Sequence, residues 1–368
     1  TGVRRMFDMA DNDAVQFGLG EPDFQPPDIA IDAFTRAMKD GRNKYTSTAG
    51  LPALRNKIAG MWHHLVPSLN ESNVCITMSG TNALLDIFLA IVNPGDKVLL
   101  PEPYFPLYPP DVIICGGEPT LYPCNFENGF VPTIADLEER VDDSTVAILY
   151  NFPSNPTGGN VNENQRDDLV EFARSHDLWL ITDEVYDRIV NDAPHVSFLG
   201  AGYDKLVMVQ SFSKTFAMTG WRIGYLLSPD EGLMNELTKM QYYVTACTND
   251  AMQYAVLEAL EMDSDYPEKM CAEFKERRDL ICERLNAIPG VTCHIPTGAF
   301  YVFPKVEIPG MTSEEIALKL LEGGVLCSPG TAFGEAGEGH LRFAYTIGRE
   351  DISRGMDRVE SVLRDLRG

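Results

Sequence analysis

The feature that most constrains the fold is a regular alternation of short apolar runs and helical patterns from Asn73 to Pro229. The runs are apolar throughout, so they fit strands that are buried on both faces of a sheet. Segments such as Ala83 to Val92 and Glu163 to His176 have the pattern of helices between these strands. We therefore predict an α/β domain with a mostly parallel sheet covered by helices. The predicted strands are Val74 to Thr77, Lys97 to Leu100, Val146 to Tyr150, Leu178 to Thr182, Leu206 to Val209 and Ile223 to Leu227.

The pattern changes after Pro229, where long helical segments replace the alternation. This part also contains strand-like runs, so it predicts a smaller α+β domain, and we expect the N-terminal segment Gly18 to Phe24 to pack with it. We assign residues 25–262 to the large domain, and residues 1–24 and 263–368 to the small domain. The predicted elements are helices at Glu231 to Glu261, Glu268 to Ala287 and Ser313 to Leu321, and strands at Ala299 to Phe303 and Leu341 to Thr346.

Four polar or glycine-rich segments follow predicted strands of the large domain. Ligands of open α/β sheets bind beyond the carboxyl ends of the strands, so segments that are far apart in sequence can meet in one crevice. Lys214 is the most informative residue among them, because it places one amine, flanked by hydroxyls, just past a buried strand. The four segments are Ser79 to Asn82, Asn151 to Gly159, Asp183 to Tyr186 and Ser211 to Lys214.

Composition and charge exclude several classes of partner. The formal net charge of −24 repels nucleic acid and anionic lipid, and an ordinary acidic soluble protein explains it better than adaptation to a salty cytoplasm. The longest apolar stretch, Leu84 to Val92, is short and contains Asp86, so we expect no membrane span. The eight cysteines include no C-x-x-C pair, which predicts neither a metal site nor a redox motif. We expect the cysteines to be reduced thiols, and the charged segment from Thr1 to Asp13 does not have the pattern of a signal peptide. Both observations predict a cytoplasmic protein.

Three motifs in this order carry a resemblance to a known family: Asn151 to Gly158, Thr182 to Tyr186 and Ser211 to Arg222. From Gly20 to Gly348 the chain resembles the fold-type I, pyridoxal-phosphate-dependent aminotransferases of class I/II, the aspartate aminotransferase family. The resemblance implies pyridoxal 5'-phosphate as the cofactor, bound by the large domain. It also implies a homodimer with sites at the subunit interface, and amino acids and 2-oxo acids as small-molecule partners.

The resemblance gives roles to the residues that act on the cofactor ring. Lys214 would bond covalently to the cofactor aldehyde, and its amine would then act as base on the substrate Cα proton. Asp183 would pair with the pyridine nitrogen and keep it protonated, so that the ring absorbs electrons. Tyr186 and Asn155 would hydrogen-bond the ring oxygen. Tyr104 resembles the aromatic residue that stacks on the ring, although an aromatic residue here could equally belong to the core.

The other matched residues concern the substrate and the phosphate. Arg342 matches the arginine that binds the substrate α-carboxylate, for which a planar guanidinium is suited, and Gly20 and Asn155 would lie near the same carboxylate. Tyr45 resembles a tyrosine that reaches the phosphate of the neighbouring subunit. The residues matched to the phosphate in their own subunit offer N–H groups at a helix start, hydroxyls and a guanidinium. They are Ser79, Gly80, Thr81, Ser211, Ser213 and Arg222.

The implied reaction transfers an amino group from an L-amino acid (aspartate, aromatic or similar) to a 2-oxo acid, with 2-oxoglutarate as the expected acceptor and ping-pong kinetics. A β-eliminating carbon–sulfur lyase is the alternative on this scaffold, although such relatives often carry His at the position of Tyr186. A pyridoxal-sensing regulator is least favoured, because it needs an added DNA-binding domain and a basic face. The donor stays open, since some dicarboxylate-acting relatives carry lysine where Thr81 stands.

Overall fold

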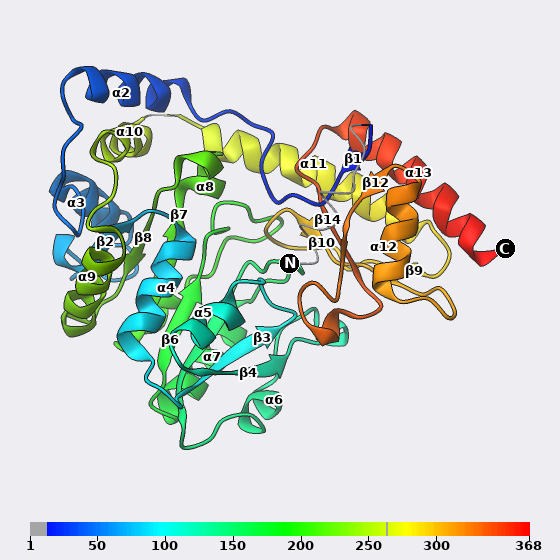
Figure 1. Cartoon of the computed structure of the whole chain (residues 1–368), viewed down its shortest axis with the longest axis horizontal. Helices are drawn as coiled ribbons and strands as arrows, with labels where there is room; N and C mark the ends of the chain where they lie inside the picture. The colour runs from blue at the N-terminus through cyan, green and yellow to red at the C-terminus, as the bar shows by residue number, and fades with distance from the viewer. Residues whose placement is uncertain (1–12, 263) are drawn as a thin grey trace.

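The computed structural model describes residues 13–262 and 264–368, and its centre is a seven-stranded sheet (Figure 1). Across the sheet the strands are β2 (Val74–Thr77), β8 (Gly224–Leu227), β7 (Leu206–Ser211), β6 (Trp179–Asp183), β5 (Thr145–Asn151), β3 (Lys97–Glu102) and β4 (Glu118–Pro123). The strands from β7 to β4 are parallel, and β8 runs antiparallel to both β7 and β2. The predicted α/β fold with a mostly parallel sheet is therefore confirmed.

The sheet is buried on both faces because alternate residues of each strand face two different hydrophobic clusters. On β7, Val207 and Val209 belong to a cluster with α4, α5 and α9, whereas Leu206 and Met208 belong to a cluster with α3, α7 and α10. All six predicted strands are present. The covering helices are α3 (Pro52–Met61), α4 (Gly80–Ile91), α5 (Tyr108–Ile114), α7 (Glu163–Ser175), α9 (Glu231–Thr245) and α10 (Asp250–Glu261).

Two features of this part differ from the sequence prediction. Strand β4 was not predicted, because at the sheet edge most of its residues are exposed or half-buried and it has no apolar run. The prediction of one helix from Glu231 to Glu261 is wrong, since α9 and α10 are separate helices. Ala246 ends α9 with a positive φ of 63°, and the Asn249 side chain caps α10 by accepting a hydrogen bond from Met252 N.

The remaining strands and two helices lie beside the sheet, along the long helix α11 (Figure 1). The predicted packing of Gly18 to Phe24 with this part is supported, because Phe24 contacts Phe274 of α11 and the Leu19 carbonyl oxygen accepts a hydrogen bond from Thr346. These elements are α11 (Tyr266–Asn286), β1 (Val15–Gln16), β9 (Val291–Thr292), β10 (Tyr301–Val302), β11 (Lys305–Val306), α12 (Ser313–Glu322), β12 (Val325–Leu326), β13 (Ser328–Pro329), β14 (Leu341–Ala344) and α13 (Arg349–Arg367). The domain boundaries stay a prediction, and residues 1–12 of the predicted small domain, with the charged chain start, lie outside the described residues.

Helix α2 lies against α10, away from the α11 side of the molecule (Figure 1). Across residues 13–262 and 264–368, none of the helices has the length and apolar character needed to span a bilayer. The remaining elements are short apart from α2 (Asp28–Lys39): α6 (Ile134–Glu138), α8 (Phe212–Thr215), and the 3-10 helices η1 (Glu71–Asn73), η2 (Phe126–Asn128), η3 (Phe198–Ala201), η4 (Thr219–Trp221) and η5 (Glu335–Gly337).

The reversed strand β8 brings three chain segments into close contact at Gly224. This residue pairs with Thr77 at the end of β2 and with Ser211 at the end of β7. A Cβ atom here would lie 2.6 Å from Gln210 O and 2.9 Å from the backbone nitrogen of Gly80. Only glycine therefore lets β7 and the start of α4 approach this closely.

Candidate active site

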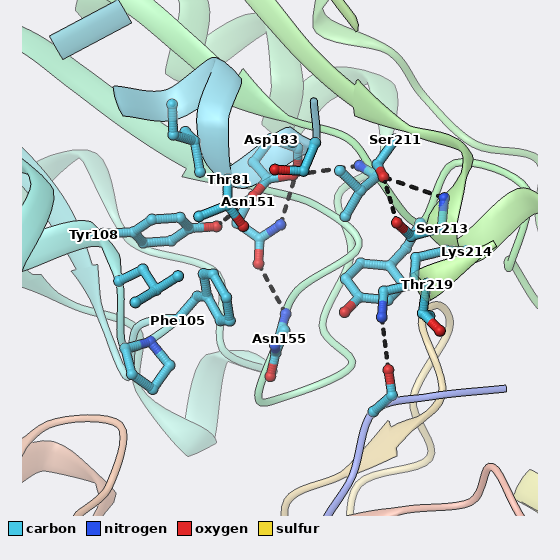
Figure 2. A pocket seen from close by; sticks show the side chains of 18 of the residues that line it. Thr81, Phe105, Tyr108, Asn151, Asn155, Asp183, Ser211, Ser213, Lys214 and Thr219 are labelled. Atoms are coloured by element: carbon cyan, nitrogen blue, oxygen red, sulfur yellow. Dashed lines mark hydrogen bonds between the residues drawn. The ribbon is translucent and has the colours of Figure 1, made fainter. Parts of the chain in front are cut away.

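A cavity of about 400 Å³ lies at the carboxyl ends of β5, β6 and β7 (Figure 2). Residues from all four predicted polar segments line it, so the expected convergence is confirmed. Gly20 and Arg342, which come from distant parts of the chain, line the same cavity. The sites predicted from sequence thus meet in one place, except for Tyr104 and Tyr45.

Lys214 lies on the single turn of α8, directly after β7. Its Nζ donates a hydrogen bond of 2.6 Å to the Gly20 carbonyl oxygen (Figure 2). Burial is the main cause that lowers the pKa of this amine to about 8, against the opposing effect of Glu21. No carboxylate forms an ion pair with Lys214 in the described part of the chain. A larger fraction of this amine is therefore uncharged near neutral pH than for an exposed lysine, and the uncharged form is the nucleophile.

Asp183 ends β6, and its side chain is buried at the cavity wall. Its Oδ2 accepts a hydrogen bond of 2.7 Å from the Tyr108 hydroxyl. Burial raises the pKa of the carboxyl to about 6, and the Tyr108 hydrogen bond opposes that shift. Asn151 donates to the Asp183 backbone oxygen at 2.9 Å, which ties the ends of β5 and β6 together. A buried carboxylate in this position is suited to bind a protonated nitrogen of a ligand.

Arg342 on β14 is a buried guanidinium without a carboxylate partner among the described residues. It donates to Asn155 Oδ1 at 2.9 Å and to the Gly18 carbonyl oxygen at 2.7 Å. Its Nε has no hydrogen-bond partner in the part of the chain that the structure describes, and its Cζ lies 4.7 Å from the centre of the Tyr301 ring and 4.6 Å from that of Phe333. The two rings and two acceptors hold the guanidinium in place while its positive charge stays available to an anion.

Tyr186 and Asn155 also lie in the cavity wall, as predicted. The Tyr186 hydroxyl is 2.9 Å from the hydroxyl of Tyr301. Asn155 follows strand β5, and its backbone nitrogen donates to Asn151 Oδ1 at 2.8 Å (Figure 2). That hydrogen bond fixes the turn and leaves the Asn155 side chain facing Arg342.

The predicted phosphate-binding residues gather around the start of α4. Ser79 is the N-cap of this helix, and Gly80 and Thr81 form its first turn, where N–H groups are free to bind an anion. Ser211 Oγ lies 2.8 Å from Ser213 Oγ on the neighbouring segment (Figure 2). Exposed Arg222 also lines the cavity, with Nη1 donating to the Thr219 carbonyl oxygen at 3.0 Å.

Two predicted residues do not line the cavity of their own chain. Tyr104 does not line it, whereas its neighbour Phe105 does, and the stacking of an aromatic residue on the cofactor ring stays a prediction. The Tyr104 backbone nitrogen donates a hydrogen bond of 2.8 Å to the carbonyl oxygen of distant Phe333, and the next side chain faces the cavity. Tyr45 is 90% exposed, and its reach into a partner subunit stays a prediction.

Besides Phe105, three aromatic residues of the lining had no role in the sequence analysis: Tyr108, Tyr301 and Phe333. Tyr108 and Tyr301 reach their partners across 75 and 115 positions of sequence. Tyr301 and Phe333 both contact Arg342 with their rings. Buried aromatic residues usually belong to a core, so no local pattern separates these three from the rest.

Comparison with known proteins identifies the family. Residues 12–359 match the family of class I and II aminotransferases. The chain belongs to this family. An aspartate aminotransferase from Pyrococcus horikoshii is 34% identical, over 98% of this chain and 94% of its own. The aromatic-amino-acid aminotransferase 2 of Thermococcus litoralis is 34% identical, over 99% of this chain and 95% of its own. A structure of Thermus thermophilus aspartate aminotransferase with maleate has a TM-score of 0.92 at 32% identity, over 98% of this chain and 94% of that one.

Class I and II aminotransferases depend on pyridoxal phosphate, which confirms the cofactor, the fold type and the transaminase activity expected from sequence. The carbon–sulfur lyase alternative is not favoured, because the full-length relatives are aminotransferases. The cavity fits this cofactor. Lys214 offers an amine of lowered pKa for the aldehyde, and Asp183 offers a buried carboxylate for the ring nitrogen. The start of α4 with the hydroxyls of Ser211 and Ser213 offers donors for the phosphate.

Proposed function

We propose that this aminotransferase moves the amino group of an L-amino acid to a 2-oxo acid in the cavity around Lys214, with ping-pong kinetics. The observation that carries the proposal is that Lys214 and Arg342 line one cavity, and neither has a carboxylate partner among the described residues. A substrate amino acid supplies the missing carboxylate for Arg342 and places its Cα near the amine. Arg342 is therefore complementary to the carboxylate that all α-amino acids share, and the partly uncharged amine of Lys214 is suited to act on the adjacent Cα.

Each proposed step uses a group described above. When bound, pyridoxal phosphate supplies an aldehyde that condenses with amines and a ring that withdraws electrons from the substrate Cα. Asp183 holds a proton at the ring nitrogen, and Tyr186 and Asn155 donate hydrogen bonds to the ring oxygen. Lys214 Nζ takes the Cα proton, because burial keeps part of this amine unprotonated near neutral pH. Gly20, whose carbonyl oxygen accepts from that amine, keeps it at the substrate side of the cavity.

The anchoring contacts complete the proposal. Ser79, Gly80, Thr81, Ser211, Ser213 and Arg222 bind the phosphate. The Phe105 ring packs on the cofactor ring, in the position predicted for Tyr104. Arg342 binds the substrate α-carboxylate through a planar fork, with Asn155 holding the guanidinium in orientation.

The cavity wall favours an amino donor with an uncharged, bulky side chain. Leu19, Phe105 and Phe333 are apolar residues of that wall. The cations that line it in the described part of the chain are Lys214, Arg222 and Arg342, all of which already have cofactor or α-carboxylate roles. No further cation in that lining is left for a side-chain carboxylate. We therefore place aromatic donors ahead of aspartate, the two donor classes named for the relatives described above.

A panel of L-amino acids assayed with 2-oxoglutarate as the common acceptor tests the donor class. We expect kcat/KM for phenylalanine or tyrosine to exceed that for aspartate by about tenfold or more, the scale on which apolar pockets discriminate. A preference for aspartate of the same size would overturn the donor assignment and leave aminotransfer itself intact. Borohydride trapping followed by peptide mass spectrometry tests the site, since the cofactor label should appear on Lys214 alone.

We also propose a homodimer in which Tyr45 of one subunit reaches the phosphate bound in the other. Support comes from its side chain, which is 90% exposed and does not line the cavity of its own chain. Mixing Tyr45→Ala with Lys214→Ala subunits should restore activity beyond either variant alone, because one site of each hybrid dimer then contains both native residues. Mixtures no more active than the Tyr45→Ala protein alone would refute the shared site.

A cytoplasmic location is the last part of the proposal. All eight cysteines are free thiols, and five of them are buried. Reduced cysteines in this number are typical of a reducing compartment. Cell fractionation with an antibody against the chain provides the test, and recovery from the membrane or the exterior would contradict it.

A further inference from the structure

The carboxylate of Asp183 depends on one side chain for its position. Tyr108 begins α5, and its side chain is fully buried. Its hydroxyl donates a hydrogen bond of 2.7 Å to Asp183 Oδ2, and both residues line the cavity (Figure 2). The other acceptor atom, Oδ1, receives only a long hydrogen bond of 3.4 Å from Val185 N. No second side chain donates to this carboxylate among the described residues.

The surroundings leave Tyr108 as the main stabiliser of a charged Asp183. Glu184 is the next residue and opposes ionisation through its negative charge, whereas Lys214 favours it more weakly than Tyr108 does. Tyr186 also faces the carboxylate, and its phenol stays neutral because burial raises its pKa well above the ordinary value. The pKa of the Tyr108 phenol is likewise raised, chiefly by burial and then by Asp183, so it remains a donor throughout the physiological range.

We propose that Tyr108 is a positioning residue for the aminotransfer reaction: its hydroxyl keeps the Asp183 carboxylate ionised and directed toward the ring nitrogen of the cofactor. This inference rests on the proposed role of Asp183 in the reaction. Tyr108 acts through that carboxylate and needs no contact with the substrate. A hydrogen bond to a buried charge is stronger than one between neutral groups, which is why a single hydroxyl is enough.

The direction of the effect follows from the charges. Burial raises the pKa of Asp183 to about 6, and the Tyr108 hydroxyl lowers it by stabilising the ionised form. Without the hydroxyl, the pKa of Asp183 rises further. Acidification then protonates the Asp183 carboxyl at a higher pH than in the wild type. The protonated carboxyl is neutral and no longer attracts a protonated nitrogen.

Tyr122 provides a matched control for loss of a buried hydroxyl. Its side chain is 1% exposed, and its hydroxyl donates to the Leu149 carbonyl oxygen at 2.6 Å. It lies on β4 and does not line the cavity. Tyr108→Phe and Tyr122→Phe each remove one buried hydrogen bond and keep the ring, so similar falls in melting temperature are expected. Only Tyr108→Phe changes the environment of Asp183.

The experiment measures Asp183 directly and then cofactor binding. In cofactor-free enzyme, carbon-13 NMR of labelled aspartate, assigned with Asp183→Asn, should show the titration of Asp183 moved upward by about one pH unit in Tyr108→Phe. Relative to the wild type, the dissociation constant of pyridoxal phosphate in the same variant should rise about tenfold at pH 5, about twofold at pH 7 and not at all at pH 9, because a pKa moved from about 6 to about 7 leaves about half of Asp183 ionised at pH 7. Tyr122→Phe should match the wild type in both measurements.

Two results separate this inference from the proposed function. If Asp183 titrates at the same pH in Tyr108→Phe as in Tyr122→Phe, the role inferred for Tyr108 is wrong, and the proposed function is unaffected. If Asp183→Asn binds the cofactor as tightly as the wild type across the pH range, the role proposed for Asp183 fails, and the inference about Tyr108 fails with it.

Discussion

Three arginines of this chain are almost equally buried, yet they are bound in two different ways. Arg277 and Arg278 on α11 are 5% and 2% exposed, and each forms ion pairs with two carboxylates. Arg342 in the cavity is 5% exposed, and within residues 13–262 and 264–368 its hydrogen-bond partners are an amide oxygen and a backbone carbonyl oxygen. The residue type and the burial are nearly the same at all three positions. The difference is that Arg342 has no carboxylate partner among the described residues.

That difference separates charges that hold the structure together from a charge kept for a ligand. Burying an ion without a counter-ion costs several kcal/mol, and burial lowers the pKa of Arg342 accordingly. On α11 the carboxylates offset this cost within the protein. In the cavity, under the function proposed above, the carboxylate of a bound substrate would offset it, which is the usual relation between stability and activity at a functional site. Lys214 belongs to the same group, since its amine binds a carbonyl oxygen and no carboxylate.

The largest effect is expected from Lys214→Ala, which removes the cavity amine. Turnover should fall by about 10⁴-fold or more, because one variant loses both the cofactor attachment and the base. Steady-state assays with the best donor measure this, with melting temperature as the check on folding. Retained transamination would place the chemistry on another residue. Lys214 could then no longer be counted among the charges kept for a ligand.

The next effect is expected from Arg342→Leu. The value of kcat/KM should fall about 100- to 1000-fold, since the substrate carboxylate loses its charged partner. The melting temperature should hold or rise, because an uncompensated buried charge is removed and the two acceptors, Asn155 and Gly18, line a cavity open to water. A large fall in melting temperature would show that Arg342 is structural, like the arginines of α11.

The matched change on α11 is Arg278→Leu, for which the opposite pattern is expected. The free energy of unfolding should fall by about 1–2 kcal/mol at pH 7, with kcat/KM close to wild type, because half-exposed carboxylates lose a hydrogen-bonded partner. Arg278 and then Lys275 lower the pKa of Asp192 to about 2 from its ordinary 3.8. The Asp192 contribution is therefore complete above pH 3.8 and lost as the pH falls toward 2. Denaturation at pH 7 and pH 2.5 checks both statements, and an equal deficit at the two values would contradict the second.

The smallest effect concerns the pH dependence of cofactor attachment. The pKa of Lys214 is lowered to about 8, so the rate of borohydride-trappable attachment to cofactor-free enzyme should rise about tenfold from pH 7 to pH 9 and then level off. Exposed lysines should continue to gain reactivity toward their ordinary pKa of 10.5. Peptide mass spectrometry separates the two populations. A Lys214 profile that still rises above pH 9 would show that the amine is not held in a desolvated site.

The sequence predicted the central sheet well because its inner strands are continuous apolar runs, as in Leu206 to Val209. It missed β4 because an edge strand that is exposed on one side carries no such run. The predicted single helix across Ala246 failed because the helical sequence pattern continues through this alanine, whose positive φ of 63° ends α9 and which no glycine or proline marks in the sequence. Local sequence therefore specified the elements that are buried on all sides and not those at edges and breaks.

The site shows the same division. Lys214, Asp183 and Arg342 lie in motifs that can be recognised along the chain, and the structure brings them into one cavity. Tyr108 and Tyr301 were missed because their partners lie 75 and 115 residues away, and a buried tyrosine has no local signature. Which of Tyr104 and Phe105 lines the cavity could not be predicted either, because this loop is bound to a distant part of the chain, through the hydrogen bond from Tyr104 N to the Phe333 carbonyl oxygen.

The close packing around Gly224 limits which substitutions the enzyme can accept at this position. A single added methyl group there would act as a wedge between Gln210 and the first turn of α4, widening the rim that is proposed to retain the phosphate. The expected defect is leakage of the cofactor, with normal catalysis once the enzyme is reloaded. A position that does not line the cavity would thereby control how long the enzyme keeps its cofactor.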